Sequence, residues 1–227
     1  MVRRRMPGRR AWLWAAGALV SAVLSYWVVW FTPLFAVDEV EVTGTGVLDP
    51  DEVAAVAEDY LDQSILRADL DAVAEAVAAF PAVKAVEVTR SWPSALRISV
   101  TEREPFLAVP VGEETFLMVD SDGVVFDEVL EIPDSIWIVE LSEPGPGDLA
   151  TLETIEVLQA LPGDLASEVE RVESPSPASV TLHLDGGRTL RWGDGSENDK
   201  KTRVATRLLA SGYRHVDVSA PDAPTVG

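Results

Sequence analysis

The pattern of hydrophobic and polar residues changes twice along this chain of 227 residues. It begins with an uncharged apolar run, Ala11–Phe31, and continues with a segment that mixes alternating runs and helical spacing. The remaining half consists mostly of short alternating runs. This succession predicts an α+β protein with a single N-terminal transmembrane helix and two outer domains.

The apolar run predicts a membrane anchor. Its 21 residues would form roughly 32 Å of helix, enough for the ~30 Å hydrocarbon core of a bilayer. Aromatic side chains that suit the headgroup level cluster at its ends, namely Trp12, Trp14, Trp27 and Trp30. Residues 1–10 carry five arginines and no acid, which predicts a cytoplasmic basic tail and an extracytoplasmic remainder.

Two alternatives to a permanent anchor remain. A cleavable signal peptide is disfavoured by the length of the run, and by Tyr26, Trp27 and Trp30 where small residues normally precede a cleavage site. A twin-arginine export signal is suggested only by Arg9-Arg10, which is a weak match.

Residues 35–105 predict a small domain with the element order β-α-α-β-β. Residues 37–42 alternate as a strand does, and Asp49 and Asp69 are placed to cap two helices. The apolar stripe of the first helix comprises Val53, Val56, Ala57, Tyr60 and Leu61. Strands follow around residues 86–89 and 96–101 as a hairpin, so the first strand must reach their sheet through the helical crossover.

This region resembles the POTRA domain of the bacterial FtsQ/DivIB family of cell-division proteins. The matching positions are Pro81, Val83, Val88, Arg90, Trp92, Pro93, Val100, Glu102, Arg103 and Pro105, together with Phe35, Val37, Val40, Val42 and Gly44 before them. They occur in the family's order, directly after a single apolar helix.

Residues 106–219 predict a mostly antiparallel β-domain with two helices, followed by a tail over residues 220–227. Strands are expected near residues 106–111, 115–119, 124–126, 135–141, 168–173, 179–184, 188–192 and 215–219, and helices near 149–161 and 200–211. The region resembles the β-domain of the same family at Asp185-Gly186, Arg191-Trp192-Gly193, Lys200-Lys201 and Val216-Asp217-Val218. Two departures are a cytoplasmic tail of about ten residues and the lack of an aromatic residue after Val218.

Charge and composition narrow the function. All 38 acidic residues follow residue 31 and face only 13 basic ones, so the outer part carries about −25. That balance argues against nucleic acid and against broad electrostatic attraction to anionic lipid, and it suits protein partners. Without cysteine, the chain has no disulfide, thiol nucleophile or thiolate metal site.

No catalytic, cofactor-binding or metal-binding residues are predicted. His183 and His215 are interpreted as structural or surface residues, and Asp120-Ser121-Asp122-Gly123 as a hairpin turn rather than a calcium loop. Asp194, Glu197 and Asp199 form a solvated loop, with weak cation binding as the alternative.

The resemblance implies a non-enzymatic scaffold of the division machinery, located in the cell membrane at the division septum. Its implied partners are FtsB/DivIC-like and FtsL-like single-pass proteins and the septal synthesis machinery. From the residues, we expect a partner strand to add to the edge strand formed by His215, Val216, Asp217, Val218 and Ser219, because nothing after it would cover it. A cationic cluster on the last helix, Lys200, Lys201, Arg203 and Arg207, is either a solvated helix face or a docking face for an acidic partner. In the second case Arg203 and Arg207 would pair with acids on the partner. The alternative is a membrane-anchored enzyme or cell-wall-binding module with the POTRA domain as a spacer.

Overall fold

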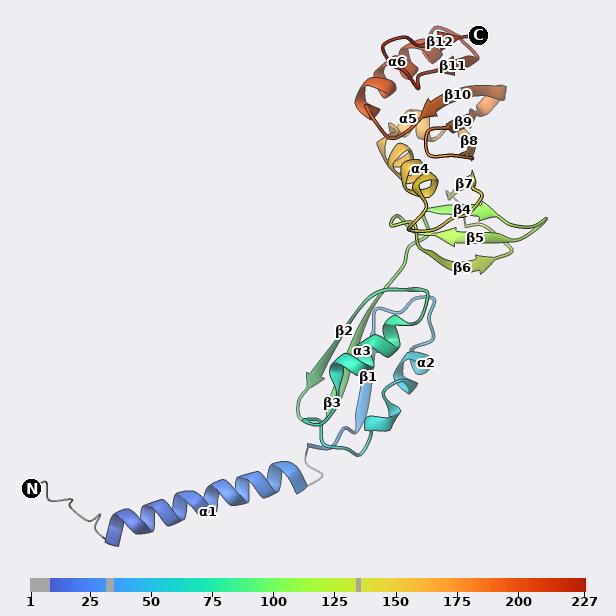
Figure 1. Ribbon diagram of the computed structural model, residues 1–227. Coiled ribbons are helices and arrows are strands. Elements are labelled where there is room, and N and C mark those ends of the chain that lie inside the picture. Colours follow the sequence, from blue (N-terminus) through green and yellow to red (C-terminus); the bar gives the residue numbers. More distant parts are fainter. Residues whose placement is uncertain (1–8, 32–34, 134–135) are drawn as a thin grey trace, which may run out of the picture. The chain divides into compact units, whose positions relative to one another are not determined.

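The computed structural model describes the backbone of residues 9–31, 35–133 and 136–227, and the side chains of residues 12–27, 35–133 and 136–227. The chain divides into two compact units, with the boundary between Glu102 and Arg103 (Figure 1).

Helix α1 (Arg9–Phe31) contains the whole apolar run. The side chains of Trp12, Trp14 and Trp27 are exposed, while the side chain of Trp30 and residues 1–8 of the predicted tail over residues 1–10 lie outside the described residues. Within the described part of the chain, the structure holds no helix with the length and apolarity required to cross a bilayer.

The rest of the first unit has the predicted β-α-α-β-β order. Its elements are β1 (Glu39–Thr43), α2 (Pro50–Ala55), the 3₁₀ turn η2 (Glu58–Tyr60), α3 (Leu70–Ala78), β2 (Val83–Ser91) and β3 (Ala95–Glu102). The sheet order is β1-β3-β2, with β1 parallel to β3 and β2 antiparallel to it, so the predicted crossover is confirmed. Asp49 and Asp69 cap α2 and α3 as expected, through hydrogen bonds from the Asp51 and Ala72 amides.

The predicted first helix is too long. Helix α2 ends at Ala55, and the chain then passes through η2 to Leu61, whose side chain is 39% exposed. Backbone pairing replaces the helix here, because Leu61 bridges Val37 at the start of the domain. The core therefore uses only part of the predicted stripe and includes Val37, Val53, Ala57, Val73, Val77, Leu96 and Ile98.

The second unit contains a nine-stranded sheet with the order β12-β11-β10-β9-β8-β7-β4-β5-β6 (Figure 1). Its strands are β4 (Leu107–Pro110), β5 (Phe116–Val119), β6 (Val125–Val129), β7 (Trp137–Glu140), β8 (Val169–Glu173), β9 (Val180–Leu184), β10 (Arg188–Gly193), β11 (His215–Asp217) and β12 (Thr225–Val226). Most neighbours are antiparallel, as predicted; the pairs β4–β7, β7–β8 and β10–β11 are parallel.

The predicted helices of this unit are α4 (Leu149–Ala160) and α6 (Asn198–Ala210). They contact each other, and α4 also contacts β9 while α6 contacts β11, so both lie on one face of the sheet. A four-residue helix, α5 (Gly163–Ala166), was not predicted because a single turn has no apolar periodicity. The core between helices and sheet includes Ile155, Leu158, Leu182, Leu190, Trp192 and Ala205.

Two adjacent residues have structural roles on either side of the unit boundary. The Glu102 carboxylate accepts hydrogen bonds from the amides of Gly46, Val47 and Leu48 in the first unit. Desolvation acts to raise the Glu102 pKa, but these three donors outweigh it and lower the pKa. In the second unit, Arg103 Nη1 lies 2.5 Å from Asp120 Oδ2, and this carboxylate is almost fully buried.

Asp120 also explains the predicted hairpin turn. Its Oδ1 accepts hydrogen bonds from the amides of Asp122 and Val124, which closes the turn between β5 and β6. Gly123, with φ of +80°, provides the left-handed residue of the turn. The Asp120 carboxylate, which a calcium loop would need as a ligand, is thus engaged by Arg103 and by the turn itself.

Candidate partner-binding edge of the second unit

The predicted partner-binding residues lie on β11, directly after it, and on α6. Strand β11 is shorter than predicted and ends at Asp217, so Val218 and Ser219 fall outside it. It runs parallel to β10, with Thr189 opposite His215 and Arg191 opposite Asp217. Ser219 turns the chain away, because its amide and hydroxyl both donate to the Asp217 carboxylate.

The expectation that nothing covers the last strand is wrong. The tail returns as β12, which pairs antiparallel with β11, with Val226 opposite Val216 and Thr225 opposite Asp217. The His215 amide donates to the Gly227 carbonyl at 3.2 Å, and the Gly227 amide donates to the His215 carbonyl at 2.9 Å. A two-residue strand with Gly and Pro nearby has too little alternation to be recognised from sequence.

The backbone groups of β11 point alternately to β10, on its inner side, and to β12, on its outer side. The Val218 amide donates to the Arg191 carbonyl of β10 at 2.9 Å, and the Val218 side chain is fully buried. Val218 therefore belongs to the inner side of the strand. The outer groups are those of His215 and Asp217, which are the residues that pair with β12.

Strand β12 offers little backbone to a further strand. Val226 occupies a non-hydrogen-bonded position opposite Val216, so its amide and carbonyl point away from β11. The Val226 side chain is 42% exposed. A shallow pocket of about 370 Å³ lies over this edge, and its lining includes Thr189, Arg191, His215 and Val226.

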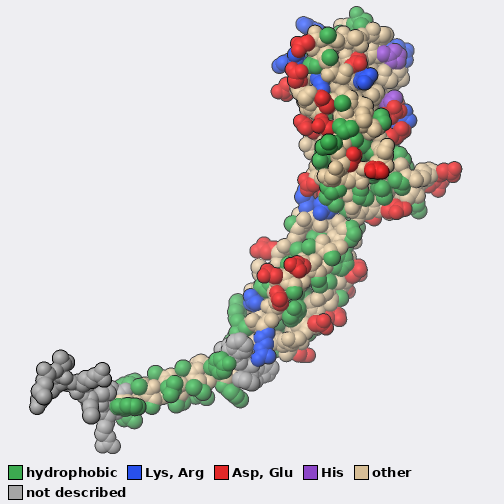
Figure 2. Space-filling model, in the orientation of Figure 1, with side chains coloured by type: hydrophobic (Ala, Val, Ile, Leu, Met, Phe, Trp, Pro, Cys, Tyr) green, Lys and Arg blue, Asp and Glu red, His purple; other side chains and the backbone are tan. Residues whose placement is uncertain are grey.

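A cation of α6 connects the helix to the tail. Lys200 Nζ lies 2.6 Å from Asp222 Oδ1, in the segment between β11 and β12, and 3.4 Å from Glu197 Oε1. The hydrogen bond to Asp222 raises the Lys200 pKa. Arg203 and Arg207 are exposed on the same helix, and Figure 2 shows basic and acidic side chains interspersed over this end of the second unit.

The structure corrects the interpretation of Lys201, which was grouped with these exposed cations. Its side chain is fully buried, and Nζ donates to Asp194 Oδ1 at 2.7 Å and to the Asp194 carbonyl at 2.9 Å. Hydrogen bonds from Lys201 and then from Ser196 lower the Asp194 pKa to about 2. Asp194 thus fixes the loop between β10 and α6, and Trp192 Nε1 donates to Asn198 Oδ1 beside it.

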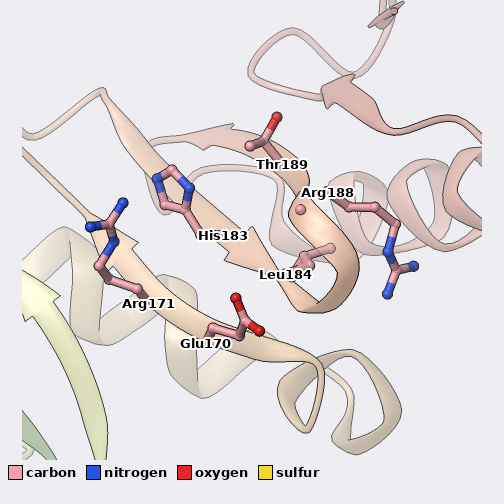
Figure 3. Close-up of a pocket in the computed structure, with 7 residues that line it drawn as sticks. Glu170, Arg171, His183, Leu184, Arg188 and Thr189 are labelled. Atoms are coloured by element: carbon pink, nitrogen blue, oxygen red, sulfur yellow. The ribbon is translucent and has the colours of Figure 1, made fainter.

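His183 lies on the open face of the sheet, in a pocket of about 360 Å³ over β8, β9 and β10 (Figure 3). Its Nε2 is 3.1 Å from Glu173 Oε1, and Arg171 contacts the same carboxylate at 2.9 Å. Figure 3 shows Arg171 and His183 on neighbouring strands, whereas Arg188 points away from them. His183 therefore lies beside the Arg171–Glu173 ion pair with its side chain 27% exposed, and its interpretation as a structural or surface residue stays a prediction.

The family models that match this chain divide it at nearly the same place as the structure does. Residues 35–103 match the FtsQ-type POTRA domain, and residues 108–219 match the C-terminal domain of the cell division protein FtsQ/DivIB. The chain belongs to the FtsQ/DivIB family. Cell division protein FtsQ of Mycolicibacterium smegmatis is 37% identical over 226 residues, covering 99% of this chain and 67% of the relative.

Other members of the FtsQ/DivIB family align over a larger share of their own length. FtsQ of Streptomyces venezuelae is 36% identical over 97% of this chain and 84% of the relative. FtsQ of Streptomyces coelicolor is 34% identical over 98% of this chain and 90% of the relative. The similarity therefore includes both units and the preceding helix.

Proposed function

We propose that this chain is a non-enzymatic scaffold of the bacterial division machinery. The observation that carries the proposal is the continuous similarity to cell division protein FtsQ over nearly the whole chain. Helix α1 would anchor the protein in the cell membrane through residues 11–31, with residues 1–10 in the cytoplasm. Residues 35–105 and 106–219 would form the POTRA domain and the β-domain outside.

The proposed partners are FtsB/DivIC-like and FtsL-like single-pass division proteins, and through them the septal synthesis machinery. These proteins would meet the β-domain on the extracytoplasmic side of the membrane. A fluorescent fusion to the N-terminus tests the location: we expect a ring at the septum, and uniform labelling of the envelope would contradict the proposed role.

The proposed binding site is the outer side of β11, at His215, Val216 and Asp217. A partner strand would displace β12 and take over the backbone groups of His215 and Asp217. Displacement is favoured over addition outside β12, because β12 exposes the backbone groups of Val226 alone. Arg203 and Arg207 on α6 would then pair with acidic residues of the partner.

Two variants separate displacement from addition. Deleting residues 222–227 removes β12 together with the Asp222 contact, whereas Val226→Pro keeps the β11 pairing but removes the outward-facing amide. The hydrogen bonds that hold β12 are worth about 1–2 kcal/mol in total, so displacing it costs roughly 5- to 30-fold in affinity.

The measurement is binding of the extracytoplasmic segment of the FtsB/DivIC-like partner to the full chain in detergent. Displacement predicts that the deletion tightens binding by roughly 5- to 30-fold and that Val226→Pro leaves it unchanged. Addition outside β12 predicts that both changes weaken it. If neither change alters the affinity, the partner does not use this edge.

A further inference from the structure

We propose that Trp92 and Phe35 form a small aromatic surface that contacts the interfacial layer of the membrane. The surface lies at the end of the first unit where the chain arrives from α1. This inference rests on the proposed anchoring of α1, and it assigns the turn between β2 and β3 to lipid rather than to a protein partner.

Trp92 is the more exposed member of the pair. It lies in the turn between β2 and β3, and 58% of its surface is accessible. Its ring packs edge-on against Phe35, with 5.9 Å between the ring centroids. A large aromatic side chain at the tip of a hairpin contributes little to the core, so its accessible surface is available to another phase.

Phe35 is itself held to the domain by backbone pairing. Its carbonyl accepts a hydrogen bond from the Ile65 amide, and the next residue, Leu66, is 37% exposed. Arg90 Nε donates to the Ile65 carbonyl and its Nη2 to the Ala68 carbonyl, which fixes this segment against β2. The aromatic pair therefore stands on a base that is fixed by backbone pairing and by the Arg90 side chain.

Chain length restricts how far this surface can lie from α1. Helix α1 ends at Phe31, and only residues 32–34 separate it from Phe35. Four residue steps span at most about 14 Å. An aromatic surface tied so closely to the end of a membrane anchor lies within reach of the headgroup layer, where Trp is the favoured side chain.

The composition favours contact with the interfacial layer through aromatic rings rather than attraction to charged lipid headgroups. The part of the chain after residue 31 is strongly acidic, so it has no general attraction to anionic lipid. Contact through aromatic rings predicts equal binding to zwitterionic and anionic bilayers, with little dependence on salt.

The absence of cysteine from the sequence makes a label experiment direct. The full chain is reconstituted in phosphatidylcholine nanodiscs that contain a spin-labelled lipid with its nitroxide near the headgroups. An environment-sensitive NBD fluorophore is attached at Ser94→Cys, two residues from Trp92. Val47→Cys is the matched control, because Val47 is 86% exposed and follows the opposite end of β1.

We expect the nitroxide to quench NBD at position 94 at least twofold more than at position 47. Adding Trp92→Ser should reduce quenching at position 94 by about half, and replacing a third of the lipid by phosphatidylglycerol should leave it unchanged. A third label, at Leu13→Cys near the end of the apolar run of α1, lies at headgroup depth if α1 spans the bilayer and so reports the anchor itself.

Three results overturn the inference. Equal quenching at positions 94 and 47, with strong quenching at position 13, means that α1 is anchored but Trp92 does not reach the lipid. Shielding of the NBD group at position 94 from water only after a division partner is added means that the surface binds protein. If position 13 is not quenched either, the proposed anchoring fails together with the inference that rests on it.

Discussion

Replacing Lys201 by Met tests whether a buried cation holds the second unit together. Met keeps the length and packing of the Lys stem but removes the ammonium group. The change breaks the hydrogen bonds from Nζ to Asp194 Oδ1 at 2.7 Å and to the Asp194 carbonyl at 2.9 Å. Met has no N–H donor, so no rotamer at this buried position restores them.

The loss of stability depends on the Asp194 carboxylate, which remains after its partner is removed. Removing one partner of a buried ion pair costs about 3–5 kcal/mol when the other charge is stranded. Here the side chain of Asp194 is 43% exposed, so water can solvate the carboxylate after the change. We therefore expect a loss of about 2 kcal/mol in the free energy of unfolding, and Lys200→Met, which removes the exposed neighbour, should cost clearly less.

The pH dependence gives a second measurement on the same variant. The Asp194 pKa is lowered to about 2, so its contribution to stability is complete above the unfolded pKa of about 3.9 and is lost as the pH falls from there toward 2. Discounted for solvent screening, this contribution is about 1 kcal/mol. It should largely disappear in Lys201→Met, because Lys201 is the main cause of the shift.

The assay is urea unfolding of the full chain in detergent, followed by the tryptophan fluorescence, to which Trp192 contributes because it is fully buried in the second unit. The reasoning is refuted if Lys201→Met is no more destabilising than Lys200→Met. It is also refuted if the two variants lose the same stability between pH 4 and pH 2.

Three further changes test the contacts that fix each unit. Glu102→Gln should lower the free energy of unfolding by about 1–2 kcal/mol at pH 7, because the charged carboxylate accepts three amide hydrogen bonds. The Glu102 pKa is lowered on folding, so this contribution is present above about pH 4.3 and is lost in acid, and urea titrations at pH 7 and in acid should show the difference disappear. Arg103→Met leaves the buried Asp120 carboxylate without its cation, so the free energy of unfolding should fall by about 3 kcal/mol. Thermal unfolding measures it, and a fall of less than about 1 kcal/mol would contradict the expectation. Gly44→Ala should lower the free energy of unfolding by at least about 2 kcal/mol, because φ is +85° and the new Cβ would lie 2.0 Å from the Val100 carbonyl oxygen. Amide hydrogen exchange of β1 and β3 would then be faster, and unchanged protection of these strands would contradict the expectation.

The sequence predicted the first unit best where local signals and long-range pairing agree. Asp49 and Asp69 both cap helices, and the alternation in β2 and β3 placed the hairpin within a few residues. Leu61 was misplaced because apolar spacing cannot reveal that backbone pairing with Val37 ends the helix early.

In the second unit, the errors concern residues whose environment depends on distant contacts. Lys201 looks like its neighbours Lys200 and Arg203 in the sequence, yet it is buried because Asp194 of the preceding loop supplies its partner. The pairing of Thr225 and Val226 with β11 depends on a turn near Pro221 and on the Asp222–Lys200 contact. Two residues carry no periodic signal, so only the folded chain reveals the strand.

The two ends of the nine-stranded sheet differ in a way that bears on where a partner strand would add. At one end, β6 exposes Asp127 and Glu128, and charges on an edge strand discourage pairing with another chain. At the other end, β11 is covered only by β12, which is two residues long and is fastened by the exposed Asp222–Lys200 pair. A short strand protects the edge from non-specific pairing at a small cost in free energy, and it can be removed by a strand that forms more hydrogen bonds. On the proposed function, a specific partner strand would therefore gain most at the outer side of β11, where it exchanges with β12.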